Sequence, residues 1–173
     1  AKFGFTADNV VKLAKERGVG VEGELGVMTG NENGDPSQGI ADETLYTEPA
    51  QAKEFVERTG VTALAASFGT VHGMYHQEPK LNYELIEQLR DATGVPIVMH
   101  GGSGLSLDEY HRSITRGVRK INYYTYAAKA ALDAALRAAD EPNTILFPKV
   151  AKAVSAQVES DVAEFIQALR PGA

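Results

Sequence analysis

Apolar residues along this chain recur first with a helical period and then in short strand-like runs, and a glycine marks each change. The repeated junctions are Arg17-Gly18-Val19, Thr59-Gly60-Val61, Thr93-Gly94-Val95 and Arg116-Gly117-Val118. Glycine just past a helix end can take the left-handed conformation that stops the helix. The β-branched valine that follows favours a strand. The pattern predicts a helix and then a strand, four times over.

Polar residues with capping chemistry mark three of the helix starts. Thr6 precedes the first helix, and Thr47 precedes one that has Pro49 in its first turn. Ser106 and Glu109 form an S-x-x-E capping box. We expect strands at 19–25, 61–68, 96–99 and 118–123, and two final helices at 125–139 and 148–169.

Helices and strands that alternate with short connections predict an α/β fold with parallel strands and helical crossovers. Four such units form either a small open sheet or half of an eight-stranded barrel. Candidate chemical residues stand at the C-terminal ends of the predicted strands: Glu24, His72, His100 and Asn122. Barrels and open sheets both place their sites at this edge, so the pattern alone leaves the two architectures open.

Composition narrows the environment and the partners. The 173 residues suit one globular domain, with 43% hydrophobic and 23% charged residues. A net charge of −6 argues against nucleic acid or an anionic membrane as a partner. The chain has no cysteine, which excludes disulfides and thiolate metal sites and fits the cytoplasm. It lacks an initiator Met and a signal-peptide core, so we expect a processed, trimmed or incomplete chain.

Two histidines and a glycine loop carry the clearest chemistry. His72 and His100 each end an apolar run and precede a glycine, and histidine is the commonest metal-binding side chain. A structural role for the pair is an equal competitor. After His100, the loop GGSG can direct the N–H groups of Gly102 and Ser103, and the Ser103 hydroxyl, at an anion. A glycine loop alone is more simply a flexible turn.

Charged and amide side chains could complete such a site. Glu22 and Glu24 share one face of the first strand, and we expect that face to line the interior. Buried carboxylates are rare unless they are paired or coordinated. These two either form a structural ion pair with a base such as Lys120 or take part in the site. Glu24, nearer the strand end, is the better candidate for a role in the site. Asn122 either holds a hydroxyl or enolate oxygen or fills an interior layer.

Two further residues suggest alternatives. Lys120 raises the possibility of a Schiff base, a covalent route that needs no metal. Glu32 lies in a long polar segment, residues 28–45, and is either a solvated charge or a mobile acid that transfers a proton over the site.

Taken together, five motifs resemble the class II (zinc-dependent) fructose-bisphosphate and tagatose-bisphosphate aldolase family. They are VEGELG at 21–26, YTEPAQAKEFVERTGV at 46–61, LAASFGTVHGMY at 64–75, VMHGGSG at 98–104 and GVRKIN at 117–122. They follow the family's order and cover most of the chain up to residue 125. The family fold is a (β/α)8 TIM barrel. The resemblance implies that residues 1–173 are the C-terminal half of one barrel domain, strands five to eight, without the N-terminal half.

The resemblance also implies roles for particular residues. His72 and His100 are zinc ligands, Glu24 matches an alternative metal site, and Glu32 is the catalytic acid of the flexible loop. The implied contacts to the substrate and its phosphate, or to a monovalent cation (Na⁺ or K⁺), come from Gly73, Gly101, Gly102, Ser103, Asn122 and Thr125. Zinc would polarise the ketose carbonyl and stabilise the enediolate formed on cleavage.

The chain departs from the family pattern in two places. Many members carry Asn-x-Asp-Thr where this chain has Asn122-Tyr123-Tyr124-Thr125, which leaves the preferred sugar open. The family's third zinc histidine and its base form an Asp-His pair, and these 173 residues contain none.

We therefore expect a glycolytic lyase that cleaves fructose 1,6-bisphosphate reversibly to dihydroxyacetone phosphate and an aldehyde such as glyceraldehyde 3-phosphate. This half should be inactive alone. Its unpaired outer strands should pair with the missing half or with another copy. We also expect a homo-oligomer, either a dimer or a tetramer. The alternatives are a Schiff-base aldolase using Lys120 and a non-catalytic half-barrel that binds sugar phosphate.

Overall fold

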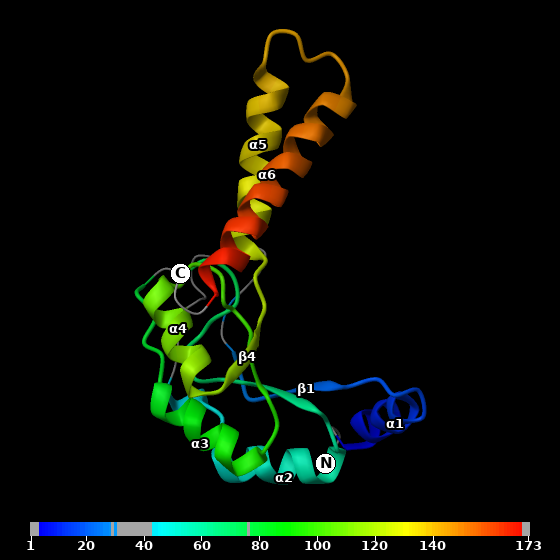
Figure 1. Ribbon diagram of the computed structural model, residues 1–173, viewed down its shortest axis with the longest axis vertical. Coiled ribbons are helices and arrows are strands. Elements are labelled where there is room, and N and C mark those ends of the chain that lie inside the picture. The colour runs from blue at the N-terminus through cyan, green and yellow to red at the C-terminus, as the bar shows by residue number, and fades with distance from the viewer. Residues whose placement is uncertain (1–3, 29, 31–42, 76, 171–173) are drawn as a thin grey trace. The chain divides into compact units, whose positions relative to one another are not determined.

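A computed structural model describes residues 4–28, 30, 43–75 and 77–170 of the chain (Figure 1). The chain divides into two compact units, Ala1–Asn122 and Tyr123–Ala173. The first unit holds a four-stranded parallel sheet whose spatial order follows the chain. Its strands are β1 (Glu22–Leu25), β2 (Ala63–Ala66), β3 (Ile97–Met99) and β4 (Val118–Ile121). All four predicted strands are present, each shorter than expected at one or both ends.

Helices connect consecutive strands, as the alternating pattern predicts. The first unit contains α1 (Gly4–Lys15), the short 3₁₀ helix η1 (Glu43–Leu45), α2 (Pro49–Thr59), α3 (Tyr83–Thr93) and α4 (Leu107–Arg116). The helices α2, α3 and α4 pack side by side in sequence order, and α3 and α4 also contact β3 and β4. Each of the first three strands is thus followed by a helix that returns the chain to start the next parallel strand.

The predicted glycine C-caps of three helices and one predicted capping box are present. Gly60 and Gly94 end α2 and α3 in the left-handed region, with φ of 70° and 68°. Gly117 differs, because it ends α4 with φ of 141°. The capping box at α4 is confirmed: the Ser106 N–H donates to Glu109 Oε2 at 2.7 Å, and the Glu109 N–H donates to Ser106 Oγ at 3.3 Å.

Two predicted helix starts are wrong. Thr6 lies inside α1, which begins at Gly4. The N-cap of α2 is Glu48 rather than Thr47. The Thr47 hydroxyl instead donates to the Leu25 carbonyl at 2.7 Å and accepts from the Ser67 N–H at 2.8 Å. It therefore joins the chain just after β2 to the end of β1, a tertiary role that outcompetes capping.

The core of the first unit consists of apolar side chains from the sheet and its helices. Fully buried members are Leu64, Phe68, Ile86, Leu89, Ile97, Val98, Met99 and Val118. Close packing of such side chains makes their truncation costly, about 2–5 kcal/mol for a buried Leu→Ala change. The core thus fixes the positions of the strands, and with them the backbone of the polar residues at the strand ends.

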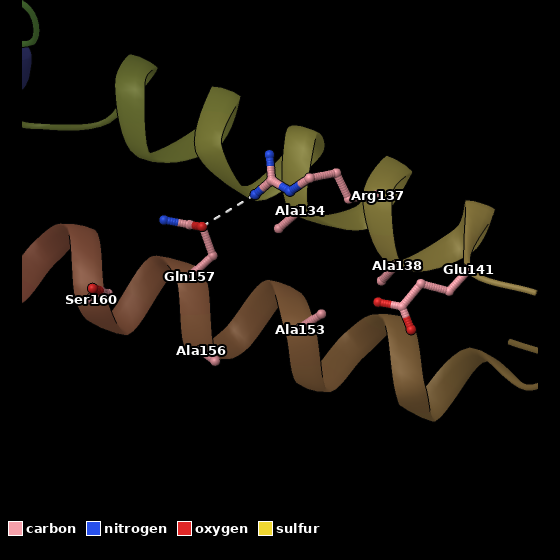
Figure 2. Close-up of a pocket in the computed structure, with 8 residues that line it drawn as sticks. All are labelled: Ala134, Arg137, Ala138, Glu141, Ala153, Ala156, Gln157 and Ser160. Atoms are coloured by element: carbon pink, nitrogen blue, oxygen red, sulfur yellow. Dashed lines mark hydrogen bonds between the residues drawn. The ribbon is translucent and has the colours of Figure 1, made fainter. Parts of the chain in front are cut away.

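The second unit is a helical hairpin of α5 (Thr125–Asp140) and α6 (Phe147–Ala168). A groove between the two helices is lined by Ala134, Arg137, Ala138, Glu141, Ala153, Ala156, Gln157 and Ser160 (Figure 2). Arg137 donates to Gln157 across it at 3.3 Å. At the other end of the hairpin, Tyr123 stacks on Phe165 and donates to Asp161 at 2.9 Å. None of the described helices has the length and apolarity needed to cross a membrane.

Candidate functional site

Strand register gathers the predicted polar side chains on one face of the sheet. Glu24 pairs with Ala65 of β2, and Ala65 pairs in turn with Val98 of β3. Val98 pairs with Lys120 of β4. Because side chains alternate in direction along a strand, Glu22, Glu24, His100 and Lys120 share this face. The prediction that Glu22 and Glu24 share one face of β1 is confirmed, although both residues are exposed in this structure rather than buried.

The His100 ring lies between two carboxylates from β1. Its Nε2 is 2.9 Å from Glu22 Oε1, and its Nδ1 is 2.9 Å from Glu24 Oε2. The His100 side chain is only 15% exposed. Both ring nitrogens therefore have a polar partner, and the plane of the imidazole is fixed.

Glu22 also binds Lys120, which lies on β4 at the opposite edge of the sheet. Lys120 Nζ lies 2.7 Å from Glu22 Oε2, with the two side chains 54% and 28% exposed. Burial by itself raises the pKa of the Glu22 carboxyl. The hydrogen bonds from Lys120 and His100, with the charges of both groups, outweigh burial and hold that pKa below its ordinary value. Glu22 is therefore a carboxylate at neutral pH.

The Glu22–Lys120 contact fits a curved sheet. In a flat sheet, three strand spacings would separate the backbones of β1 and β4 by about 14 Å, with side chains standing parallel and apart. Outer strands that tilt toward each other over the polar face bring the two side-chain ends together, as the 2.7 Å ion pair has them. Curvature of this kind belongs to a barrel wall rather than to a flat open sheet.

His72 stands beside His100 at the same edge. It follows β2, and its backbone forms a parallel bridge with Gly30. The two imidazole centres are 5.8 Å apart, with their planes inclined by 46°. Two imidazoles on one tetrahedral zinc would have centres about 5 Å apart, so this spacing suits a shared metal. Within the part of the chain that the structure describes, no three His, Cys, Asp or Glu side chains form a metal-binding group.

The glycine loop after His100 is held by backbone contacts and two tyrosine hydroxyls. Tyr75 donates to the Gly101 carbonyl at 2.8 Å, and the buried Tyr110 donates to the Gly102 carbonyl. The Gly102 N–H donates to the Asn122 carbonyl at 3.2 Å, so it is engaged within the protein. The next peptide is trans. Its N–H, at the buried Ser103, therefore points away from Tyr110.

The remaining predicted residues have different positions. Gly73 follows His72 in a buried turn with φ of 91°. The Asn122 N–H donates to the Met99 carbonyl at 2.8 Å, which fixes its backbone beside His100. Thr125 begins α5 in the second unit, and Glu32 lies outside the described residues. The roles of Thr125 and Glu32 remain predictions.

Tyr75 and Tyr110 were not among the predicted site residues. A buried tyrosine generally finds a partner for its hydroxyl, so each was recognisable as a hydrogen-bonding residue. The partner depends on which loops meet in space, and no local spacing encodes that.

A parallel sheet with helical crossovers and two histidines at its C-terminal edge is the arrangement found in the wall of a βα barrel. Comparison with known proteins then specifies the family. Residues 5–170 match the family described as "Fructose-bisphosphate aldolase class-II". The chain belongs to this aldolase family.

Relatives support this assignment. A fructose-bisphosphate aldolase of Geobacillus stearothermophilus is 43% identical over 116 residues, which cover 67% of this chain and 39% of the relative. The Escherichia coli K12 protein YdjI is 40% identical over 161 residues, which cover 87% of this chain and 55% of the relative. The chain thus spans about half the length of the curated relatives that it matches.

Solved structures identify the architecture. The crystal structure of the YdjI aldolase from E. coli K12 superposes with a TM-score of 0.69 and 36% identity, over 91% of this chain and 53% of that one. A fructose-bisphosphate aldolase from Campylobacter jejuni superposes with a TM-score of 0.67 and 24% identity, which supports the fold. The four βα units are half of a class II aldolase TIM barrel, as the resemblance implied.

Proposed function

We propose that this chain is the C-terminal half of a zinc-dependent aldolase that reversibly cleaves a ketose 1,6-bisphosphate, with fructose 1,6-bisphosphate as the first candidate. The products are dihydroxyacetone phosphate and an aldehyde such as glyceraldehyde 3-phosphate. The observation that carries the proposal is the pair His72 and His100, whose ring centres lie 5.8 Å apart at the C-terminal edge of the sheet.

The two histidines would hold the zinc, which supplies Lewis-acid polarisation of the ketose carbonyl. Of the two carboxylates on His100, Glu22 is the better anchored, because Lys120 holds its other oxygen. Glu24 is more exposed, at 43%, and lies at Nδ1. We assign Glu22 to orienting the ring through Nε2, and Nδ1 to the metal, with Glu24 at an alternative metal position. A carboxylate behind a metal-binding histidine fixes its tautomer and orientation.

The glycine loop would bind the phosphate of the dihydroxyacetone phosphate portion. The Ser103 N–H points away from Tyr110, and with the Ser103 hydroxyl and the backbone at Gly73 and Gly101 it supplies the donor groups. A monovalent cation, Na⁺ or K⁺, would share this region. The Gly102 N–H, which is held by Asn122, supports the loop instead of the ligand.

The remaining roles would fall to three polar side chains. Asn122 and Thr125 would bind substrate hydroxyl groups. Glu32 would transfer a proton to or from the substrate.

Two zinc ligands and no base leave this chain short of the three ligands and open position of a catalytic zinc site. We infer that activity belongs to the complete barrel, meaning this chain joined to the N-terminal half that the relatives' length implies. Both units would then belong to one barrel domain. The outer edges of β1 and β4 would pair with the missing half, and the whole would form a cytoplasmic dimer or tetramer.

The test compares the complete barrel with the chain alone in a coupled assay for dihydroxyacetone phosphate. We expect turnover only from the complete barrel, lost with EDTA and restored by zinc. His100→Ala should abolish it. His111→Ala, on α4, is the matched control and should leave it unchanged. Turnover by the chain alone, or turnover that survives EDTA, would contradict the proposal.

A Schiff base at Lys120 is less well supported, because its Nζ is engaged in the ion pair with Glu22. Borohydride treatment with substrate separates the two mechanisms, since only the Schiff base yields a covalent adduct. A complete barrel that binds zinc and phosphate without turnover would instead indicate a non-catalytic sugar-phosphate-binding protein.

A further inference from the structure

Tyr75 connects the two loops that carry the histidines. It lies three residues beyond His72 in the loop after β2. Its hydroxyl donates to the Gly101 carbonyl at 2.8 Å and accepts from the Val71 N–H at a longer 3.4 Å. Val71 immediately precedes His72, and Gly101 immediately follows His100. One hydroxyl therefore joins the backbone beside one histidine to the backbone beside the other.

A direct backbone contact supports the same connection. A Cβ atom added at Gly101 would lie 2.1 Å from the Val71 carbonyl oxygen, and Gly101 has φ of 63°. Only glycine permits this approach in this conformation. The two loops are thus in contact at the peptide groups next to both histidines. This contact between the loops helps to fix the imidazole centres of His72 and His100 at 5.8 Å from each other.

We propose that the Tyr75 hydroxyl is a positioning group that sets the separation of His72 and His100 for a shared metal. The inference rests on the proposed function for the identity of the bound group. The hydroxyl uses its proton for Gly101 and an oxygen lone pair for Val71. Its action differs from that of Glu22, which orients the ring of one histidine. Tyr75 instead fixes the distance between the two histidines.

Removal of the hydroxyl leaves two backbone groups without this partner. Val71 is 1% exposed, so its N–H has little access to water when the bond is lost. The loops can restore hydrogen bonding only by separating or rotating, and either motion moves an imidazole. Residues that orient metal ligands through hydrogen bonds typically account for about 10-fold or more in metal affinity, and we expect a loss of that order when the loops that carry the ligands move.

The experiment compares Tyr75→Phe with Tyr46→Phe in the complete barrel. Tyr46 donates to the Lys80 carbonyl at 3.2 Å, so the control also loses one tyrosine-to-carbonyl bond in the same unit. We measure the dissociation constant for Co²⁺, the visible spectrum of the cobalt-saturated protein, and hydrogen exchange at the Val71 amide.

Tyr75→Phe should weaken Co²⁺ binding roughly tenfold, alter the spectrum at saturation and speed Val71 exchange. Tyr46→Phe should match the wild type in all three. A general loss of stability would not change the spectrum of a saturated site, so this readout isolates positioning. Wild-type cobalt spectrum and affinity in Tyr75→Phe would overturn the inference.

Two further outcomes separate the inference from the proposed function. A wild-type barrel that binds no Co²⁺ refutes the proposed function, and unchanged Val71 exchange in Tyr75→Phe refutes the connection itself. If Tyr75→Phe does not fold, the wild type supplies the test. Co²⁺ binding should slow Val71 exchange because the contact between the two loops couples them, and exchange insensitive to Co²⁺ overturns the inference.

Discussion

Replacing Gly101 by alanine tests the contact between the two histidine loops, and the chain offers a matched control. The added Cβ would lie 2.1 Å from the Val71 carbonyl oxygen, at a backbone φ of 63°. Gly94 has nearly the same φ, 68°, and a Cβ there meets nothing within 4 Å. Gly94→Ala therefore isolates the cost of the left-handed conformation, while Gly101→Ala adds the collision.

The magnitudes follow from these two terms. A non-glycine residue in the left-handed region costs about 1–2 kcal/mol, and this applies to both variants. The altered entropy of the unfolded chain also applies to both and cancels in the comparison. The collision forces a backbone group aside in a close-packed region, where excess volume costs about 1–3 kcal/mol. Gly101→Ala should therefore be less stable than Gly94→Ala by about 1–3 kcal/mol.

Urea unfolding of the complete barrel measures the difference, provided that the two variants share the same m-value. Gly101→Ala should also bind Co²⁺ more weakly than the wild type, whereas Gly94→Ala should bind it normally. Equal midpoints and equal Co²⁺ affinities in the two variants would refute the argument that the loops depend on this close approach.

Two other predictions concern single side chains. Glu22→Gln should weaken zinc binding by the complete barrel about tenfold, because the amide orients His100 less firmly than the carboxylate; unchanged affinity in a zinc titration would contradict this role. Burial raises the pKa of Tyr83, against the opposing charge of Arg112, whose guanidinium lies 3.9 Å from the ring centre. A raised pKa in the folded state means that stability is lost as pH rises above about 10, and Tyr83→Phe should lose less over that range in thermal melts; equal slopes would exclude this cause.

Features decided by neighbouring residues were predictable from the sequence. The glycine ends of α2 and α3 and the capping box of α4 depend on contacts within one helical turn, so their signals are local. The shared face of Glu22 and Glu24 was predictable because a strand alternates its side chains. The possible partner of Glu22 was also recognised, and Lys120 does bind it.

Features that depend on contacts between distant parts of the chain could not be predicted from the sequence. Thr47 has a good N-cap side chain, yet its hydroxyl binds groups at Leu25 and Ser67 that lie 22 and 20 residues away in sequence. The hydroxyl of Tyr75 finds the Gly101 carbonyl 26 residues further along. Pattern alone also left barrel and open sheet undecided, because curvature is a collective property of four strands.

The ion pair between Glu22 and Lys120 has a consequence for assembly. The sheet pairings join successive βα units, whereas this contact joins the first strand to the last, 98 residues apart. It crosses the polar face of the sheet, and its contribution to the bend is modest because the Lys120 side chain is 54% exposed. If the proposed N-terminal half completes the barrel, it would meet two outer strands that are already linked across that face. Closure of the barrel would then need little further bending of this sheet.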